Sequence, residues 1–345
     1  MKTLAELPED LLYAVAEALK RDRSALVALT RSCRSLHRAT RSVLYRHIDK
    51  VSRDQLKQLN RTFSADPSLK AYVQSYSLYL EYGEVLDDGL ETLVEFPNLR
   101  ELIFDSSHKV HVPAHLSPMN RIGQMRRGRP EGQDFLCRFL DTCSFPGIQS
   151  IVLSGNFTST EIMRFMLLPS VRALRAGGLG SLHAPLLPES GTAETCKLSM
   201  LSLTGDGLWS VEPSTMRSIS QTCPMLQEFL CQIPVTASQT PPQGMRLSQV
   251  IRAVSPTILD WVFAPLHSTL RRLSLLQLRH NVPYDGTFMN LSMFEQLADL
   301  EITSCCLLPP GPPCNKRDML YQLLPASLVQ LKVSNFPLHC YTHIN

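Results

Sequence analysis

The stretch TLRRLSL, from Thr269 to Leu275, decides the fold because the chain repeats its pattern. It has the form Leu-x-x-Leu-x-Leu, and the alternation in its second half is typical of a strand with one buried face. Most copies follow one another at 23 to 31 residues, and two steps are nearly double that length. The first apolar residues of the nine copies, the first being the weakest, are Val73, Leu99, Ile148, Val171, Leu198, Leu226, Leu270, Leu297 and Leu328.

This period and pattern resemble those of leucine-rich-repeat proteins. The resemblance implies an α/β fold in which residues 51–345 form a curved solenoid, with parallel strands on the concave face and helices outside. Phe-Pro, Leu-Pro or Cys-Pro introduces four of the copies. Helices are expected between copies at 87–95, 133–143, 158–167 and 212–222, and a buried helix at 258–263. Pro- and Gly-rich composition predicts loop insertions at 108–131 and 234–245.

Residues 1–50 form a separate helical segment in this interpretation. Leu11, Leu12, Val15 and Leu19 recur at helical spacing after Leu7-Pro8, where proline suits a first helical turn. Asp22 or Ser24 can cap a second helix, expected to carry its apolar stripe as far as Leu36. A third helical piece is expected at 41–48. Three short helices bury little surface alone, so the stripes of the first two predict a protein partner.

The same segment resembles the F-box, particularly its fungal form. The matching residues are Leu7, Pro8, Leu11, Leu12, Val15, Leu26, Val27, Leu29, Cys33, Arg34, Leu36, Leu44, Tyr45, Arg46, His47 and Ile48. The resemblance implies docking on a Skp-type adaptor and, through it, on a cullin scaffold. The residues expected to bind the adaptor are Leu7, Pro8, Leu11, Leu12, Val15, Leu19, Leu26, Leu29, Cys33 and Leu36. The sequence departs from the family at Ala25, where an acidic residue is usual, and at Arg31, where an apolar one is common.

Charge is concentrated in this segment. Residues 20–53 hold ten basic and two acidic residues, a local charge of +8, so the rest of the chain carries −5 of the net +3. A basic face suits an acidic partner, and acidity is typical of Skp-type adaptors. Binding of nucleic acid through Arg34, Arg38 and Arg41 is the weaker alternative because the remainder is acidic.

Composition and motifs favour a non-enzymatic protein without cofactor. The chain is 44% hydrophobic and 19% charged, which is typical of a globular protein; it has no membrane-length apolar run and no signal peptide. Ten scattered cysteines predict reduced thiols in the cytoplasm or nucleus. No nucleophile elbow, phosphate loop or zinc-protease motif occurs. The group Cys305, Cys306, Cys314, His339, Cys340 and His343 has no Cys-x-x-Cys pair, so no metal is expected.

The strand residues between the buried positions are expected to line the concave face. Across the eight stronger copies the 24 such positions hold five acidic and three basic residues, net −2, which fits protein binding better than nucleic-acid binding. The residues selected for substrate binding are Glu101, Ile103, Val152, Arg175, Glu228, Leu230, Arg272, Glu301 and Lys332.

These observations lead to one functional prediction and one alternative. The prediction is the substrate-recognition subunit of a cullin–RING ubiquitin ligase of the SCF type, with catalysis supplied by other subunits. The alternative is a leucine-rich-repeat interaction scaffold that does not join a ligase, a reading favoured by Arg31. Only a short segment follows the last copy, without an evident capping repeat.

Overall fold

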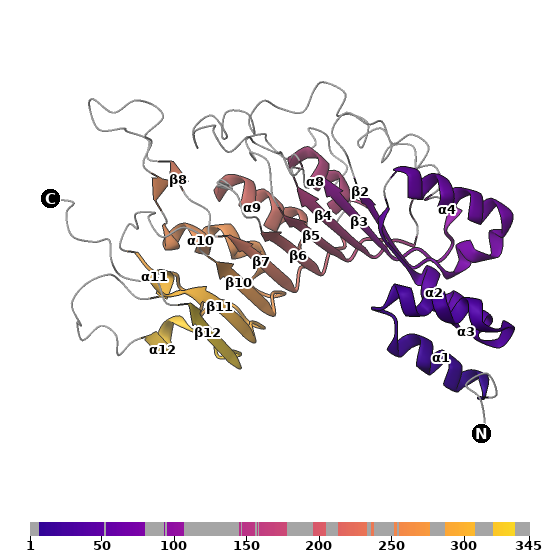
Figure 1. Ribbon diagram of the computed structural model, residues 1–345. Coiled ribbons are helices and arrows are strands. Elements are labelled where there is room, and N and C mark those ends of the chain that lie inside the picture. The colour runs from indigo at the N-terminus through magenta and orange to yellow at the C-terminus, as the bar shows by residue number, and fades with distance from the viewer. Residues whose placement is uncertain are drawn as a thin grey trace, which may run out of the picture. The chain divides into compact units, whose positions relative to one another are not determined.

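A computed structural model describes residues 7–51, 53–79, 93, 95–106, 145, 147–155, 157, 159–177, 196–204, 213–232, 236–237, 252–253, 255–276, 287–307 and 320–334. The chain divides into two compact units, residues 1–152 and 153–345. The fold is α/β, and ten strands form one sheet in the order β1-β2-β3-β4-β5-β6-β7-β10-β11-β12 (Figure 1). The predicted division at residues 50 and 51 falls within a strand and stays a prediction.

Unit 1 contains the N-terminal helices and the first strands. Its elements are α1 (Glu9–Ala18), α2 (Arg23–Ser32), α3 (Arg34–Arg46), β1 (His47–Val51), α4 (Arg53–Ala65), the 3-10 helix η2 (Pro67–Tyr72), β2 (Ser75–Tyr79) and β3 (Glu101–Ser106). Helices α1 and α2 both pack on α3, which also contacts η2 and β1. The helical segment is therefore continuous in packing with the first repeat.

The N-terminal helices end at different places from those expected. Asp22 caps α2 as predicted, with Oδ1 accepting the N–H of Ala25 at 3.0 Å. This hydrogen bond is the main reason that the pKa of Asp22 is lowered. Cys33 then adopts extended backbone and ends α2, so Leu36 lies on α3. The expected third piece at 41–48 was wrong in extent: α3 runs from residue 34, and Ile48 is a buried strand residue of β1.

Unit 2 continues the alternation of strands and helices. Strand β4 (Ser150–Gly155) crosses the division between the units. The elements that follow are α8 (Ser159–Met166), β5 (Ala173–Gly177), β6 (Met200–Thr204), α9 (Pro213–Thr222), β7 (Glu228–Gln232), β8 (Thr236–Ala237), β9 (Arg252–Ala253), α10 (Pro256–Phe263), the 3-10 helix η6 (Ala264–Leu266), β10 (Arg272–Leu276), β11 (Asp299–Thr303), α11 (Ser304–Leu307), α12 (Leu320–Leu323) and β12 (Gln330–Ser334). Helices α8, α9 and α10 lie along one side of the strands (Figure 1).

Every predicted repeat copy becomes a strand of the sheet. Each strand begins two residues after the first apolar residue of its copy, as β10 does after Leu270. Neighbouring strands pair in parallel with equivalent positions opposite each other, so that Leu273 faces Phe229 on one side and Leu300 on the other. These three side chains are at most 2% exposed. Each fully buried side chain of this size contributes about 1.5–3 kcal/mol, so the aligned rows form the core.

The proline phrases act as turns that lead into the strands. In the described cases the carbonyl oxygen of the residue before proline accepts the N–H of the first apolar residue. Thus Leu226 donates to Cys223 at 3.1 Å, and Val171 donates to Leu168 at 3.2 Å. Proline is favoured at the second position of such turns because its φ angle is already fixed. The turn therefore sets where each of these four strands begins.

The expected helices and loops of the repeat region agree with the structure to different degrees. Helices α8 and α9 confirm those predicted at 158–167 and 212–222 within a residue, and α10 confirms the helix near 258–263. The burial expected for α10 was wrong at Trp261, whose side chain is exposed, whereas Leu259, Val262 and Phe263 are buried. The predicted loop at 234–245 includes strand β8, which pairs antiparallel with β9. The insertion at 108–131 and the helix at 133–143 lie outside the described residues, as does nearly all of 87–95.

Candidate functional site

The N-terminal helices close a small core of their own. Three residues expected to bind an adaptor, Leu12, Leu26 and Leu36, are 2–4% exposed. Leu12 and Leu36 belong to one apolar cluster with Ala39, and Leu26 to a second with Ala16 and Val43. Five others are half-buried against these clusters or beside them: Leu7, Val15, Leu19, Leu29 and Cys33. The buried members can affect a partner only by holding the helices together.

Helix α1 carries a second apolar stripe that remains in solvent. The inward stripe contains Leu12, Ala16 and Leu19. Leu11 is 51% exposed, and Ala14 and Ala18 are exposed three and seven residues further on. Residues at this spacing share one side of a helix. Pro8, also expected to bind the adaptor, is exposed at the start of the same helix.

The basic residues of the segment fall into two groups. Arg41 pairs with Asp66, donates to Ser68 Oγ at 2.7 Å and lies over the Tyr72 ring, and Arg46 pairs with Glu17 at 2.7 Å. A hydrogen bond from Lys20, with Arg46 nearby, lowers the pKa of Glu17. The exposed arginines without a partner among the described residues are Arg21, Arg23, Arg31, Arg34 and Arg38.

The second candidate site is the face of the sheet that points away from the buried rows. Its central row in unit 2 consists of Arg175, Ser202, Leu230, Ser274, Glu301 and Lys332, which lie opposite one another on successive strands. A parallel row begins with Ala173 and continues through Met200, Glu228, Arg272, Asp299 and Gln330. The structure thus brings together six of the nine residues selected for substrate binding. We call these two rows the outward face.

The other three selected residues belong to unit 1. Glu101 and Ile103 lie on β3 and are half-buried, as is Val152 on β4. Glu101 accepts the hydroxyl of Ser75, on the neighbouring strand, at 2.8 Å. This carboxylate is therefore already engaged within the sheet.

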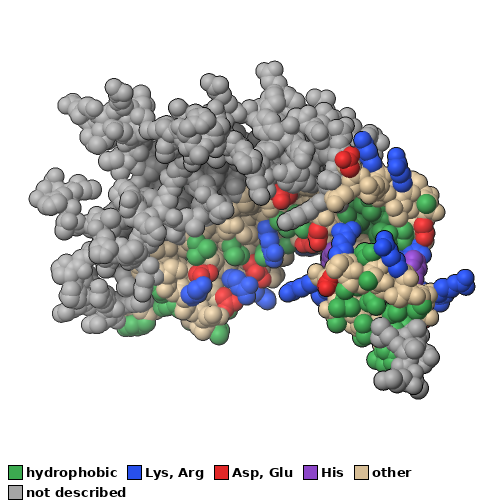
Figure 2. Space-filling view, viewed as in Figure 1, with side chains coloured by type: hydrophobic (Ala, Val, Ile, Leu, Met, Phe, Trp, Pro, Cys, Tyr) green, Lys and Arg blue, Asp and Glu red, His purple; other side chains and the backbone are tan. Residues whose placement is uncertain are grey.

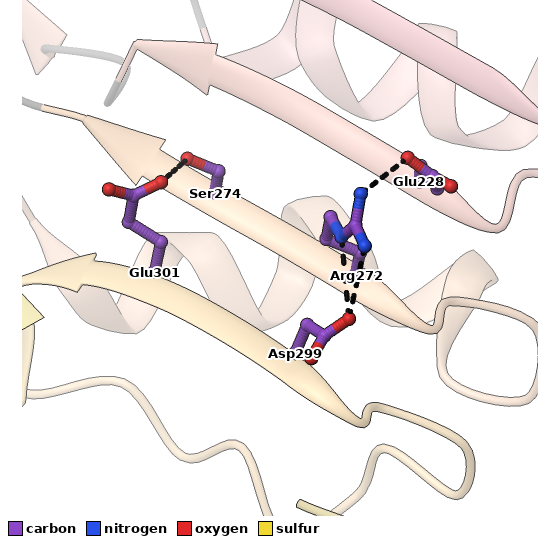
Figure 3. A network of polar contacts seen from close by, with 5 residues as sticks. All are labelled: Glu228, Arg272, Ser274, Asp299 and Glu301. Carbon is purple, nitrogen blue, oxygen red and sulfur yellow. Dashed lines mark hydrogen bonds and ion pairs between the residues drawn. The ribbon is translucent and has the colours of Figure 1, made fainter. Parts of the chain in front are cut away.

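Most charged residues of the outward face in unit 2 neutralise one another, and Figure 3 shows the group around Arg272. Arg272 lies between two acidic residues, with Nη1 3.2 Å from Glu228 Oε2 and Nη2 3.3 Å from Asp299 Oδ2. Lys332 pairs with Glu301, which also accepts the Ser274 hydroxyl at 3.0 Å. Acidic and basic side chains accordingly lie side by side over the strands of unit 2 in Figure 2.

Glu301 has the least exposed side chain of these ion-paired residues. The hydrogen bond from Lys332 is the main reason that the pKa of Glu301 is lowered, and the Ser274 hydroxyl adds to the effect. Exposed ion pairs of this kind are worth about 0–1 kcal/mol each. Their main effect is to set the charge pattern of the face.

Two features of this face were missed from the sequence. Ser202 and Ser274 occupy outward positions but are 7% and 2% exposed. Asp299 was not among the selected residues, although it holds Arg272. The burial of the two serines could have been predicted from their small size between longer residues on the neighbouring strands, because such neighbours cover a small side chain.

Comparison with models of known protein families gives no match, and a search of curated proteins gives none. Within the described ranges, no helix has the length and apolar character needed to cross a membrane. No three His, Cys, Asp or Glu side chains in that same part of the chain are placed to hold a metal ion. Cys306 is buried there, whereas Cys314, His339, Cys340 and His343 fall outside it.

Proposed function

We propose that this protein is a non-catalytic substrate receptor of an SCF-type ubiquitin ligase. In this proposal helices α1 to α3 are an F-box that docks on a Skp-type adaptor, and the ten-stranded sheet is the concave wall of a leucine-rich-repeat solenoid that holds a target protein. Other subunits bring the ubiquitin-transfer chemistry, and the receptor contributes proximity.

The exposed stripe of α1 is the observation that carries the proposal. The helices already bury Leu12, Leu26 and Leu36 between themselves, so Leu11, Ala14 and Ala18 are not needed for that core. An apolar stripe left in solvent on one helix is characteristic of a protein-binding surface. Leu11 is the largest of its side chains and the natural centre of a contact.

The unpaired arginines support an acidic partner. The five exposed arginines lie on or beside α2 and α3. Lys20, Arg41 and Arg46, in contrast, pair with acidic residues of the same unit. Unpaired surface charge of one sign accelerates association with a surface of the opposite sign. Binding should therefore weaken as ionic strength increases.

The outward face supports the target-binding half of the proposal. It presents regularly spaced side chains on a rigid sheet, with Leu230 and Met200 half-exposed among polar residues. A mixed, partly apolar surface is typical of protein-binding interfaces.

The test is co-purification of the full chain with a Skp-type adaptor. We compare the wild type with Leu11→Asp, which places a charge on the exposed stripe without touching the buried clusters. Met293→Asp is the matched control, because Met293 is 61% exposed and lies in unit 2. Leu12→Asp is unsuitable, since it would disrupt the helical core itself.

We expect the wild type and Met293→Asp to bind and Leu11→Asp to lose at least about tenfold in affinity. Equal binding by all three variants would show that the α1 stripe is not the docking surface. A folded wild type that does not bind would leave the repeat scaffold outside a ligase as the better account.

A further inference from the structure

One cation of the outward face is not neutralised. Arg175, on β5, has an exposed side chain with no ion-pair or hydrogen-bond partner among the described residues. The other two cations of the face differ in this respect, because Arg272 lies between two carboxylates and Lys332 pairs with Glu301. No described residue uses the N–H donors of the Arg175 side chain, so they can bind a ligand.

The surface beside Arg175 is apolar. Ser202, the next residue along the central row, is 7% exposed, and Leu230 follows it on β7. Met200 lies on the same strand as Ser202, two residues before it, and both Met200 and Leu230 are half-exposed. Along the central row, a cation (Arg175) is therefore followed by a small residue (Ser202) and an apolar one (Leu230).

The charged residues beyond Leu230 make the net charge of the face uneven. Arg272 with Glu228 and Asp299 carries a net charge of −1, and the pair of Glu301 with Lys332 carries none. An anion is therefore attracted toward β5 and repelled from β7, β10 and β11. Of the described positions on the outward face of unit 2, Arg175 is where an acidic ligand group is favoured.

We propose that Arg175, Met200 and Leu230 bind an extended segment of a target protein that carries a carboxylate two or three residues away from an apolar side chain. Arg175 would donate two hydrogen bonds to the carboxylate, and the apolar side chain would cover Met200 and Leu230. This inference rests on the proposed target-binding role of the outward face and does not depend on the adaptor.

Strand spacing sets the expected pattern in the target. Neighbouring strands lie about 4.8 Å apart, so β5 and β7 are separated by about 9.6 Å. An extended peptide advances about 3.3 Å per residue. The acidic and apolar residues of a segment crossing the strands should therefore be two or three positions apart, in either chain direction.

The test is selection of phage-displayed random peptides on the purified full chain, followed by affinity measurement of the enriched peptides. Arg175→Glu is the main variant, and Arg175→Lys keeps the charge without the two-point geometry. Arg271→Glu is the matched control, because the Arg271 side chain is exposed and contacts no charged or hydrogen-bonding group among the described residues, and the substitution makes the same change in charge. Thermal melts of each variant check that it is folded.

We expect enriched peptides with Asp or Glu two or three residues from an apolar residue. Their affinity should fall at least about tenfold for Arg175→Glu, fall less for Arg175→Lys and change little for Arg271→Glu. The proposal is overturned if no peptide is enriched, if the enriched peptides lack the acidic residue, or if Arg175→Glu binds them as the wild type does. These outcomes are independent of adaptor binding, so failure here is distinct from failure of the ligase proposal.

Discussion

Replacing one leucine at the same position of three successive strands tests whether the repeats form one continuous core. Leu273, Leu300 and Leu331 lie opposite one another on β10, β11 and β12. The first two are at most 2% exposed, whereas Leu331 is 39% exposed on the last described strand. The free energy lost on substitution by alanine should follow this burial.

The magnitudes follow from the carbons removed. Leucine to alanine deletes three carbon atoms, worth roughly 2–2.5 kcal/mol when fully buried, and the cavity adds to this for Leu273 and Leu300. We expect a loss of about 3–5 kcal/mol at each of these two positions. At Leu331 only about three-fifths of the transfer term applies and water fills the gap, so about 1–1.5 kcal/mol is expected.

The measurement is urea unfolding followed by far-UV circular dichroism, with hydrogen exchange of the strand amides to detect partial unfolding. Exchange is needed because repeat arrays can lose two-state behaviour. Equal losses at Leu273 and Leu331 would refute the reasoning, because they would mean that the last strand is covered as fully as the interior ones.

Two further predictions concern groups away from the outward face. Burial raises the pKa of Asp260 to about 6, although its carboxylate accepts the backbone N–H of Asn290. The folded state then binds more protons than the unfolded state between about pH 4 and 6, and stability falls as the pH rises through that window. Asp260→Asn keeps a hydrogen-bond acceptor but removes the charge. Thermal melts should therefore show the variant to be more stable than the wild type by about 1 kcal/mol at pH 8, a value reduced because the carboxyl is half-exposed. At pH 4 the two proteins should be equally stable. Cys196 and Cys223 are buried with Sγ atoms 3.2 Å apart, whereas Cys33 is half-buried, so native-state labelling with iodoacetamide, read by mass spectrometry, should modify Cys33 before Cys196 or Cys223. Prompt labelling of Cys196 would contradict that burial.

The repeating part of the fold could be predicted because its signal is local and redundant. The period-2 alternation after Leu270 or Leu297 fixes which strand residues are buried, and parallel in-register pairing then aligns the copies. The turn that precedes each strand is equally local, as the Leu226-to-Cys223 hydrogen bond shows. Each of these features rests on residues a few positions apart.

The helical segment was predicted less well because its outcome depends on packing. Leu11 and Leu12 are adjacent, and both fit an apolar stripe, but only the positions of α2 and α3 decide that Leu12 is enclosed. No strong helix-breaking residue at Cys33 predicts the extended backbone found there. The partners of Arg272 likewise come from copies 27 and 44 residues away, which single-copy patterns do not connect.

The in-register pairing makes neighbouring repeats interchangeable in shape but not in chemistry. Excising the 27 residues from Leu273 to Asp299 would join Arg272 directly to Leu300, and the fused strand would keep its offset from both neighbours. Arg272 would then face Gln330 in place of Asp299. Recombination between copies could in this way change the charge pattern of the outward face while leaving the backbone intact, so the order of the repeats determines where acidic and basic groups lie on the surface.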